Sequence, residues 1–281
     1  MSNLIRTLTY DGWVSLTVAD TTKMVQTAQK LHNLSKTSTL LLGKALSAMT
    51  FMSSCLKNEQ GEISLSLQTD GEIGSIGVSG NQALNMRGYI QNTALVDGAE
   101  ITSFGDKTAF TIIRDDGYNR PFVGTCALPQ GGDLDDGFEE YYAISEQLCT
   151  RLGTKVAFDD EGKVCFAGVI ALQPLPFAKE ELVAEIENME LDSLFNELQQ
   201  KGAEQTAKDN FKVDESVFEK RTAQYKCNCS RFYLSRVLVS LGEAELRRII
   251  KEDGSVKVHC HYCNTDYEFT EKDADELFQK E

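Results

Sequence analysis

The chain lacks long apolar runs and an N-terminal targeting pattern. Its longest apolar stretches, such as "VCFAGVIAL" at residues 164–172, are much shorter than the roughly 20 residues that a membrane-spanning helix needs. Its start, "MSNLIRTLTY", does not combine a basic region with an apolar one, as a secretion signal does. We therefore expect a cytoplasmic protein without a membrane partner.

The chain also lacks a basic excess and the motifs of nucleotide chemistry. Its net charge is −15, so most of its surface would repel a phosphate backbone, and no nucleic-acid partner is expected. The glycines of "GEIGSIG" at residues 71–77 do not have the spacing of a phosphate-binding loop and indicate a hairpin turn. None of the three histidines is placed for a catalytic triad. We expect His32 to be a surface or packing residue, and the protein not to be an enzyme.

Residues 1–177 have the pattern of an α+β domain of mixed sheets and helices. Alternating apolar positions on both sides of Asp11-Gly12 predict a hairpin with a two-residue turn. Residues 21–34 and 38–56 have helical spacing, the second with Leu42, Leu46, Met49 and Met52 on one side. Residues 62–90 and 154–172 alternate as strands around turns, and residues 137–152 are predicted to be helical.

Residues 178–226 form an acidic linker. No proline follows Pro176, and between residues 178 and 220 five basic side chains face twelve acidic ones. Apolar residues recur at helical spacing from Lys179 to Gln200, which predicts one charged amphipathic helix. From Gly202 to Lys226 the apolar residues are scattered, so little burial offsets the cost of ordering this segment. We expect it to be ordered only while something holds it.

Residues 227–281 contain four of the eight cysteines, in a C-x-C pair and a C-x-x-C pair. Four thiolates in two short pairs around a folded insert are typical of a structural zinc site, with one zinc ion per chain. We therefore predict that Cys227, Cys229, Cys260 and Cys263 are the metal ligands. His259 and His261 flank a full ligand set and are expected outside it.

The insert between the two pairs has helix signals. Ser230 is predicted to cap a helix through Val239, and Ser240 with Glu243 to form a capping box for a second helix that stops at Asp253-Gly254. Residues 255–269 then indicate strand, knuckle and strand. The remaining cysteines, Cys55, Cys126, Cys149 and Cys165, lie in apolar contexts and are each expected to fill the core.

The C-x-C spacing also permits redox chemistry. Cysteines two or three residues apart can reach the Cα separation of about 4.4–6.8 Å that a disulfide needs, so each pair can oxidise internally. Oxidation of both pairs would remove all four zinc ligands and unfold a module of about 60 residues that has little core of its own. The linker would then lose its anchor and expose the apolar surface that it covers.

Several motifs together resemble those of the heat shock protein 33 family of redox-regulated holdase chaperones. They are "CNC" and "CHYC" with their long gap, "SLGEAEL" between them, "GDLDDGFEEYYAISEQ", and the N-terminal "TLTYDGWVSLTVADTTKMVQTAQKLHN". The resemblance covers nearly the whole chain, although residues 91–115 match less recognisably. The four additional cysteines are not part of the family pattern.

The resemblance implies a fold and a mechanism. The fold is an N-terminal α+β domain with client-binding and dimerisation surfaces (1–177), a metastable helical linker (178–226) and a C-terminal redox-switch zinc domain (227–281). The reduced, zinc-bound form is inactive, and oxidation forms Cys227–Cys229 and Cys260–Cys263 disulfides and releases zinc. The activated homodimer then holds unfolded client proteins without ATP and passes them to ATP-dependent foldases.

Two other functions use the same cysteines. A zinc-ribbon protein that binds RNA or the ribosome could use Arg231, Arg236, Arg247 and Arg248 to contact phosphate, although the acidic balance opposes this. A thiol–disulfide oxidoreductase would need its C-x-x-C at a helix N-terminus, where the helix dipole stabilises a thiolate. Here the motif continues into strand-like sequence.

Overall fold

The computed structural model describes residues 3–97, 104, 107–128 and 133–278. The chain divides into two compact units, residues 1–226 and 227–281. Both contain helices and antiparallel strands, which confirms the α+β class.

The first unit contains two sheets on either side of a central helical layer, one antiparallel and one antiparallel except for the parallel pair of β11 with β5. The five-stranded sheet has the order β10-β1-β2-β9-β8 and the six-stranded sheet the order β11-β5-β4-β3-β6-β7. The strands of the first are β1 (Leu4–Thr9), β2 (Val14–Asp20), β8 (Arg151–Phe158), β9 (Val164–Pro174) and β10 (Glu219–Arg221). Those of the second are β3 (Glu62–Gln68), β4 (Ser75–Asn81), β5 (Asn85–Ile90), β6 (Ala109–Asp115), β7 (Phe122–Cys126) and β11 (Gln224–Tyr225).

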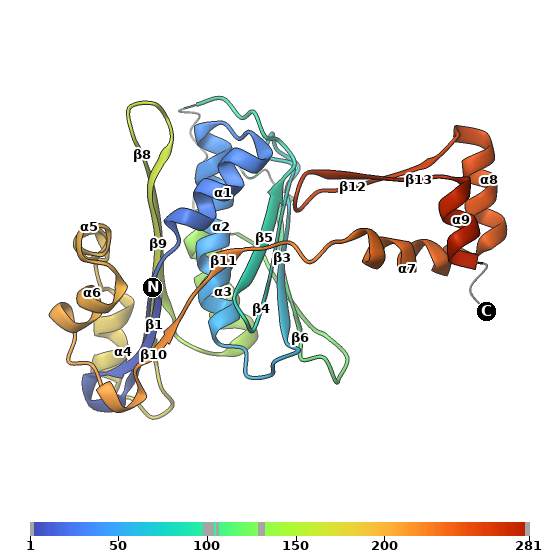
Figure 1. Cartoon of the computed structure of the whole chain (residues 1–281). Helices are drawn as coiled ribbons and strands as arrows, with labels where there is room; N and C mark the ends of the chain where they lie inside the picture. The colour runs from blue at the N-terminus through green and yellow to red at the C-terminus, as the bar shows by residue number, and fades with distance from the viewer. Residues whose placement is uncertain (1–2, 98–103, 105–106, 129–132, 279–281) are drawn as a thin grey trace. The chain divides into compact units, whose positions relative to one another are not determined.

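Three helices fill the space between the sheets (Figure 1). They are α1 (Thr22–His32), α2 (Lys36–Ser54) and α3 (Leu134–Tyr141), which continues as a π-helical turn at Tyr142–Glu146. Helix α2 contacts both sheets and is buried on nearly every side, rather than along the single stripe that its spacing predicted. Its position explains this, because a helix between two sheets has no face left for water.

Three short helices of the linker cover the opposite face of the five-stranded sheet (Figure 1). They are α4 (Glu180–Glu187), α5 (Asp192–Lys201) and α6 (Ala203–Asn210). Successive residues of a strand point to opposite faces of the sheet. Leu4 therefore packs into the central core between the sheets, whereas the next residue, Ile5, packs under the linker helices with Leu16 and Phe195. The linker therefore covers a second, smaller hydrophobic core.

The prediction of a single helix from Lys179 to Gln200 was wrong. The helix breaks between Glu187 and Asp192, where Leu191 turns inward and is only 4% exposed. Gly153 on β8 makes room for it, because a Cβ there would lie 2.7 Å from a methyl carbon of Leu191. Arg151 Nε donates to the Met189 carbonyl, which the break leaves without a helical partner (3.0 Å).

The segment from Gly202 to Lys226 pairs with both sheets. After α6 and a 3₁₀ turn at Glu215–Val217, β10 pairs antiparallel with β1 and β11 pairs parallel with β5. The chain thus crosses from the edge of one sheet to the edge of the other within a few residues. Its scattered apolar pattern carried no signal for this.

Two further boundaries differ from the prediction. The first hairpin is joined by four residues, Tyr10 to Trp13, rather than two, because Tyr10, Asp11 and Gly12 all have positive φ. The predicted helix at 137–152 ends at Glu146, where Gln147 adopts the left-handed conformation and β8 begins shortly after. The other predicted strands of this unit are confirmed.

The second unit is small. It contains α7 (Arg231–Leu241), α8 (Glu243–Asp253), the hairpin of β12 (Val256–Cys260) and β13 (Thr265–Phe269), and α9 (Glu271–Phe278), which was not predicted. Ser230 caps α7 as predicted, and its side chain accepts from Tyr233 N (3.1 Å). The capping box at Ser240 was wrong, because α7 continues to Leu241 and Ser240 Oγ donates back to Val237 O instead.

Candidate metal centre

The four C-terminal cysteines converge. Their sulfur atoms all lie within 4.8 Å of one another, and each cysteine is partly buried. Cys227 and Cys229 lie in the extended segment that leads into α7, while Cys260 ends β12 and Cys263 lies in the turn before β13. Two segments more than 30 residues apart thus meet at one point, as their spacing predicted.

The sulfur positions fit a tetrahedral metal. Zinc–sulfur bonds of about 2.3 Å place the corners of a tetrahedron about 3.8 Å apart. Cys227 Sγ and Cys260 Sγ are separated by 3.8 Å, and Cys229 Sγ and Cys263 Sγ by 3.1 Å. Burial raises the pKa of the Cys227 thiol, and a bound cation would favour the thiolate instead. The donor set is therefore suited to a soft divalent metal.

Arg231 links the two halves of the centre. Its guanidinium donates to the Glu268 carbonyl on β13 (2.8 Å), forms an ion pair with Asp273 on α9, and lies 4.5 Å from the ring centre of Phe269. Because Arg231 directly follows the capping Ser230, these contacts hold the C-x-C segment next to the hairpin that carries the C-x-x-C.

Side chains around the sulfurs form an outer layer. The Tyr267 hydroxyl lies 3.3 Å from Cys229 Sγ, and this contact raises the pKa of Tyr267 to about 12, so the hydroxyl stays protonated. His259 Nδ1 lies 2.7 Å from Asp266 Oδ1, and the exposed His259 and His261 rings contact each other. Neither histidine belongs to the four-sulfur cluster, as the sequence indicated.

Little apolar surface supports this unit. Its buried core consists of Leu238, Leu246, Ile250, Phe269 and Ala274. Five fully buried apolar side chains are a small core for some 50 residues, whose ordering costs conformational entropy. Six partly buried apolar residues pack against this core: Leu234, Val256, Val258, Tyr267, Leu277 and Phe278. A metal ion held by the four sulfurs would add to this limited packing.

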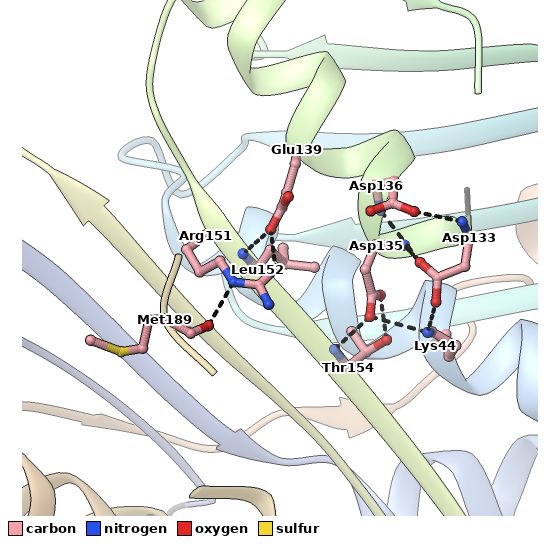
Figure 2. Close-up of polar contacts among 9 residues, drawn as sticks. All are labelled: Lys44, Asp133, Asp135, Asp136, Glu139, Arg151, Leu152, Thr154 and Met189. Carbon is pink, nitrogen blue, oxygen red and sulfur yellow. Dashed lines mark hydrogen bonds and ion pairs between the residues drawn. The ribbon is translucent and has the colours of Figure 1, made fainter. Parts of the chain in front are cut away.

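A polar cluster in the first unit explains the "GDLDDGFEEYY" motif (Figure 2). Asp133 and Asp136 form a capping box at the start of α3. Asp135 accepts from the Thr154 amide (2.9 Å) and hydroxyl and pairs with Lys44 (3.1 Å). Burial raises the pKa of Asp135 to about 6. This cluster joins α2, α3 and β8.

The same helix also reaches the linker. Glu139 on α3 accepts from the Leu152 amide (2.7 Å) and from Arg151 (2.9 Å), whose Nε donates to Met189 O at the helix break (Figure 2). Sequence reasoning did not find Arg151, because it placed this residue in the predicted helix 137–152 rather than at the start of β8. Arg151 therefore positions the linker on β8.

The other four cysteines differ in burial. Cys126 is buried, as expected, and Cys55 and Cys149 are partly buried. Burial raises the pKa of Cys126 to about 11 and that of Cys149 to about 12, so both thiols stay protonated. The core prediction was wrong for Cys165, which is exposed, because it lies between the buried Val164 and Phe166 on β9 and alternation turns it outward.

One pairing was missed at the end of the linker. The hydroxyl of Tyr225 lies 3.0 Å from His32 Nε2 and donates to Gly88 O (2.8 Å). His32 is therefore a packing partner of the residue that lies two positions before the first cysteine of the cluster. Only long-range contacts place these residues together, so no local pattern could have indicated it.

A comparison with protein families identifies the chain. The model of the family described as "Hsp33 protein" matches residues 2–270. This chain belongs to the Hsp33 family. The resemblance inferred from the cysteine spacing and the motifs is thereby confirmed.

Curated relatives of this Hsp33 chain agree with the assignment. It is 32% identical to the 33 kDa chaperonin of Bacillus mycoides (strain KBAB4), over 99% of this chain and 98% of the relative. It is 31% identical to that of Bacillus cytotoxicus, over 98% of each. The crystal structure of the 33 kDa chaperonin from Thermotoga maritima has the same fold, with a TM-score of 0.82 at 24% identity over 99% of this chain and 98% of that one.

Membership in the Hsp33 family makes this chain a chaperone rather than an enzyme. Chaperones of this kind bind client proteins, and this one carries a four-cysteine cluster able to bind a metal ion. Among the helices that the structure describes, none has the length and apolar character to cross a membrane.

Proposed function

We propose that this protein is a redox-regulated, ATP-independent holdase that prevents aggregation of unfolding proteins under oxidative and heat stress. The observation that carries the proposal is the convergence of Cys227, Cys229, Cys260 and Cys263 in a unit with a very small core. In the reduced form these four cysteines bind one zinc ion. The zinc-bound form is inactive.

Zinc supplies the stability that the small unit lacks. Structural zinc contributes on the order of 10–16 kcal/mol in finger peptides. Oxidation forms the Cys227–Cys229 and Cys260–Cys263 disulfides, which removes all four thiolates at once. Each disulfide forms from two thiolates, which give two electrons to peroxide or hypochlorous acid; protons from water complete the reduction of the oxidant, and zinc leaves. The unit 227–281 then unfolds.

Unfolding of the redox unit releases the linker. The proposed linker, 178–226, contributes Leu194, Phe195 and Leu198 to the core that it shares with Leu16, Val18 and Ile170 of the five-stranded sheet. When α4 to α6 separate from the sheet, both apolar faces become accessible to clients. The domain 1–177 supplies this client-binding surface and the contacts of the active homodimer, and clients pass later to ATP-dependent foldases.

The two rival functions are less compatible with the site. Arg231, Arg247 and Arg248 are engaged by carboxylates, Arg247 by Glu243, Glu271 and Asp275, which leaves them poorly suited to bind phosphate. The C-x-x-C lies in the turn between β12 and β13 rather than at a helix N-terminus, where an oxidoreductase would have its nucleophile.

The test follows zinc release and aggregation of a denatured client together. Peroxide at moderately raised temperature should release about one zinc per chain and suppress client aggregation, and reduction with zinc restored should reverse both. Peptide mapping should find Cys227–Cys229 and Cys260–Cys263. Zinc that is retained, or lost without any gain in client holding, would refute the redox switch. Crossed pairs, Cys227 with Cys260 and Cys229 with Cys263, would refute the connectivity only.

A further inference from the structure

The last part of the linker occupies the ends of both sheets. We call residues 219–226 the strap. Its strand β10 is the end strand of the five-stranded sheet, beside β1, and its strand β11 is the end strand of the six-stranded sheet, beside β5. In the register, Glu219 lies opposite Arg6 and Gln224 opposite Asn85. Removal of the strap would therefore turn β1 and β5 into edge strands.

Backbone groups hold most of the strap. Asn3 N donates to Arg221 O (3.1 Å), Gln224 N to Leu84 O (3.0 Å), and Lys226 N to Met86 O (2.7 Å). The Asn3 side chain also bonds the backbone of Ala223 at both its amide and its carbonyl (2.8 and 3.1 Å). An edge that is satisfied by main-chain hydrogen bonds accepts almost any extended chain.

The strap side chains alternate between outward and inward positions. Thr222, Gln224 and Lys226 are exposed, whereas Ala223 is buried and Tyr225 is partly buried against the central core. The inward positions take Arg221, whose guanidinium donates to Ser54 O and Gln82 O, followed by one small and one aromatic side chain. Among the outward side chains, Gln224 Nε2 donates to Asn85 Oδ1 (2.9 Å). The occupant that fits is an extended segment with a small residue two positions before a large apolar one.

The strap is held by few hydrogen bonds and lies beside an open cleft. β10 has three residues and β11 has two, and an open cleft of 780 Å³ is lined by residues 222–225 together with parts of α1, α5 and α6. Strands this short make few ladder bonds, and water in the cleft can compete for them. The strap is also directly followed in sequence by Cys227.

We propose that the edges of β1 and β5, once the strap is released, bind extended segments of unfolded clients by strand addition. The proposal rests on the proposed function and specifies the partner's chemistry: an extended backbone rather than a folded surface. An unfolded chain offers such backbone in every sequence, which accounts for broad client binding by main-chain hydrogen bonds. The strap is then an internal substitute for a client and keeps two adhesive edges covered until oxidation.

The test uses the oxidised full-length protein and reduced, carboxymethylated α-lactalbumin, which stays unfolded. A peptide of residues 217–226 should compete and raise the apparent Kd for this client about tenfold or more. The same peptide N-methylated at Gln224 and Lys226, the amides that bond Leu84 and Met86, should compete much more weakly, because it can no longer pair with β5. A control N-methylated at Thr222, which lies in neither β10 nor β11, should compete like the parent peptide.

Hydrogen exchange provides the second measurement. Amides of β1 and β5 should become exchangeable on oxidation and be protected again when the client is added. Normal client affinity without edge protection and without peptide competition would overturn the inference while leaving the holdase function intact. Protection that returns without client and rises with protein concentration would overturn it too, because the strap of a second copy would then fill the edges. An oxidised protein that binds no client at all would refute the proposed function, and this inference with it.

Discussion

The two compact units of this chain differ in what holds them together. The first has a central core of buried side chains from both sheets and three helices, plus a second core under the linker. The second has five buried apolar residues and four clustered thiols. Burial of apolar surface is insensitive to oxidants, whereas thiolate ligation is lost on oxidation. A single chain can therefore keep a stable platform while one part responds to redox state.

Loss of one of the four cysteines should produce the largest difference in stability between the two units. Cys263→Ser should remove most of the metal's contribution, on the order of 10 kcal/mol. Residues 227–278 should unfold and the linker should be released, while the sheets and helices of residues 3–177 stay folded. Hydrogen exchange of the full chain with a zinc assay measures both. Cys165→Ser, which removes an exposed thiol, is the matched control and should change neither. Equal loss of protection in both units would contradict the comparison.

A substitution in the central core of the first unit should destabilise that unit and leave the second unit unchanged. Phe51 on α2 is 1% exposed, and Phe51→Ala should lower the free energy of unfolding of the first unit by about 3–5 kcal/mol. Zinc affinity should stay unchanged, because no zinc ligand depends on this core. The exposed Lys57→Ala serves as control. If zinc affinity fell together with the stability of the first unit, the metal centre would depend on that unit being folded.

A substitution in the linker should weaken its docking on the five-stranded sheet without affecting the central core or zinc binding. Leu198 is 1% exposed and packs at Gly168 of the five-stranded sheet. Leu198→Ala should destabilise its docking by about 2–4 kcal/mol, and this should speed exchange in α5 and α6 and lower the temperature at which oxidised protein holds client. The exposed Gln200→Ala on the same helix should behave like the parent. An unchanged activation temperature would argue against linker release as the activating step.

Asp135 should make the stability of the first unit depend on pH. Its folded pKa of about 6 lies above the ordinary value of 3.8, so folding takes up a proton between about pH 4 and 6. The stabilisation is present below about pH 4 and is lost as pH rises through 6, on the order of 1–3 kcal/mol. In Asp135→Asn this contribution to the slope of unfolding free energy against pH should disappear. A variant with the parent's slope would refute the assignment to Asp135.

The smallest effect concerns helix capping in the second unit. Ser230→Ala removes the N-cap of α7 and should cost about 1 kcal/mol, seen as a modest loss of zinc affinity at constant pH. Ser240→Ala, a serine at the other end of the same helix that caps no helix, should have little effect. Equal losses in the two variants would show that the cap does not support the C-x-C segment.

Local patterns predicted much of this architecture. Strand alternation at residues 62–90 and 154–172 and the apolar spacing of α1 were sufficient, because each pattern repeats over several residues. Ser230 and Gly254 marked helix ends through the chemistry of single residues. The turn of the first hairpin and the end of α3 were misplaced, since turn length depends on the backbone angles of a few residues.

Long-range packing decided the rest. The break between α4 and α5 follows from the space above Gly153 and from Arg151, which are distant in sequence. The pairing of β10 and β11 with two different sheets involves five residues, too few for a periodic signal.

The sequence by itself predicted that the four C-terminal cysteines cluster, because residue type and spacing within each pair are local properties typical of a metal site. It also determined the α+β class and, through its motifs, the family. Only the tertiary structure decided that the linker covers a second core and that its last residues complete two sheets. The physical reason is that backbone pairing and side-chain burial join residues such as Asn3 and Ala223, more than 200 positions apart, and no local pattern encodes which distant edge a short polar segment will fill.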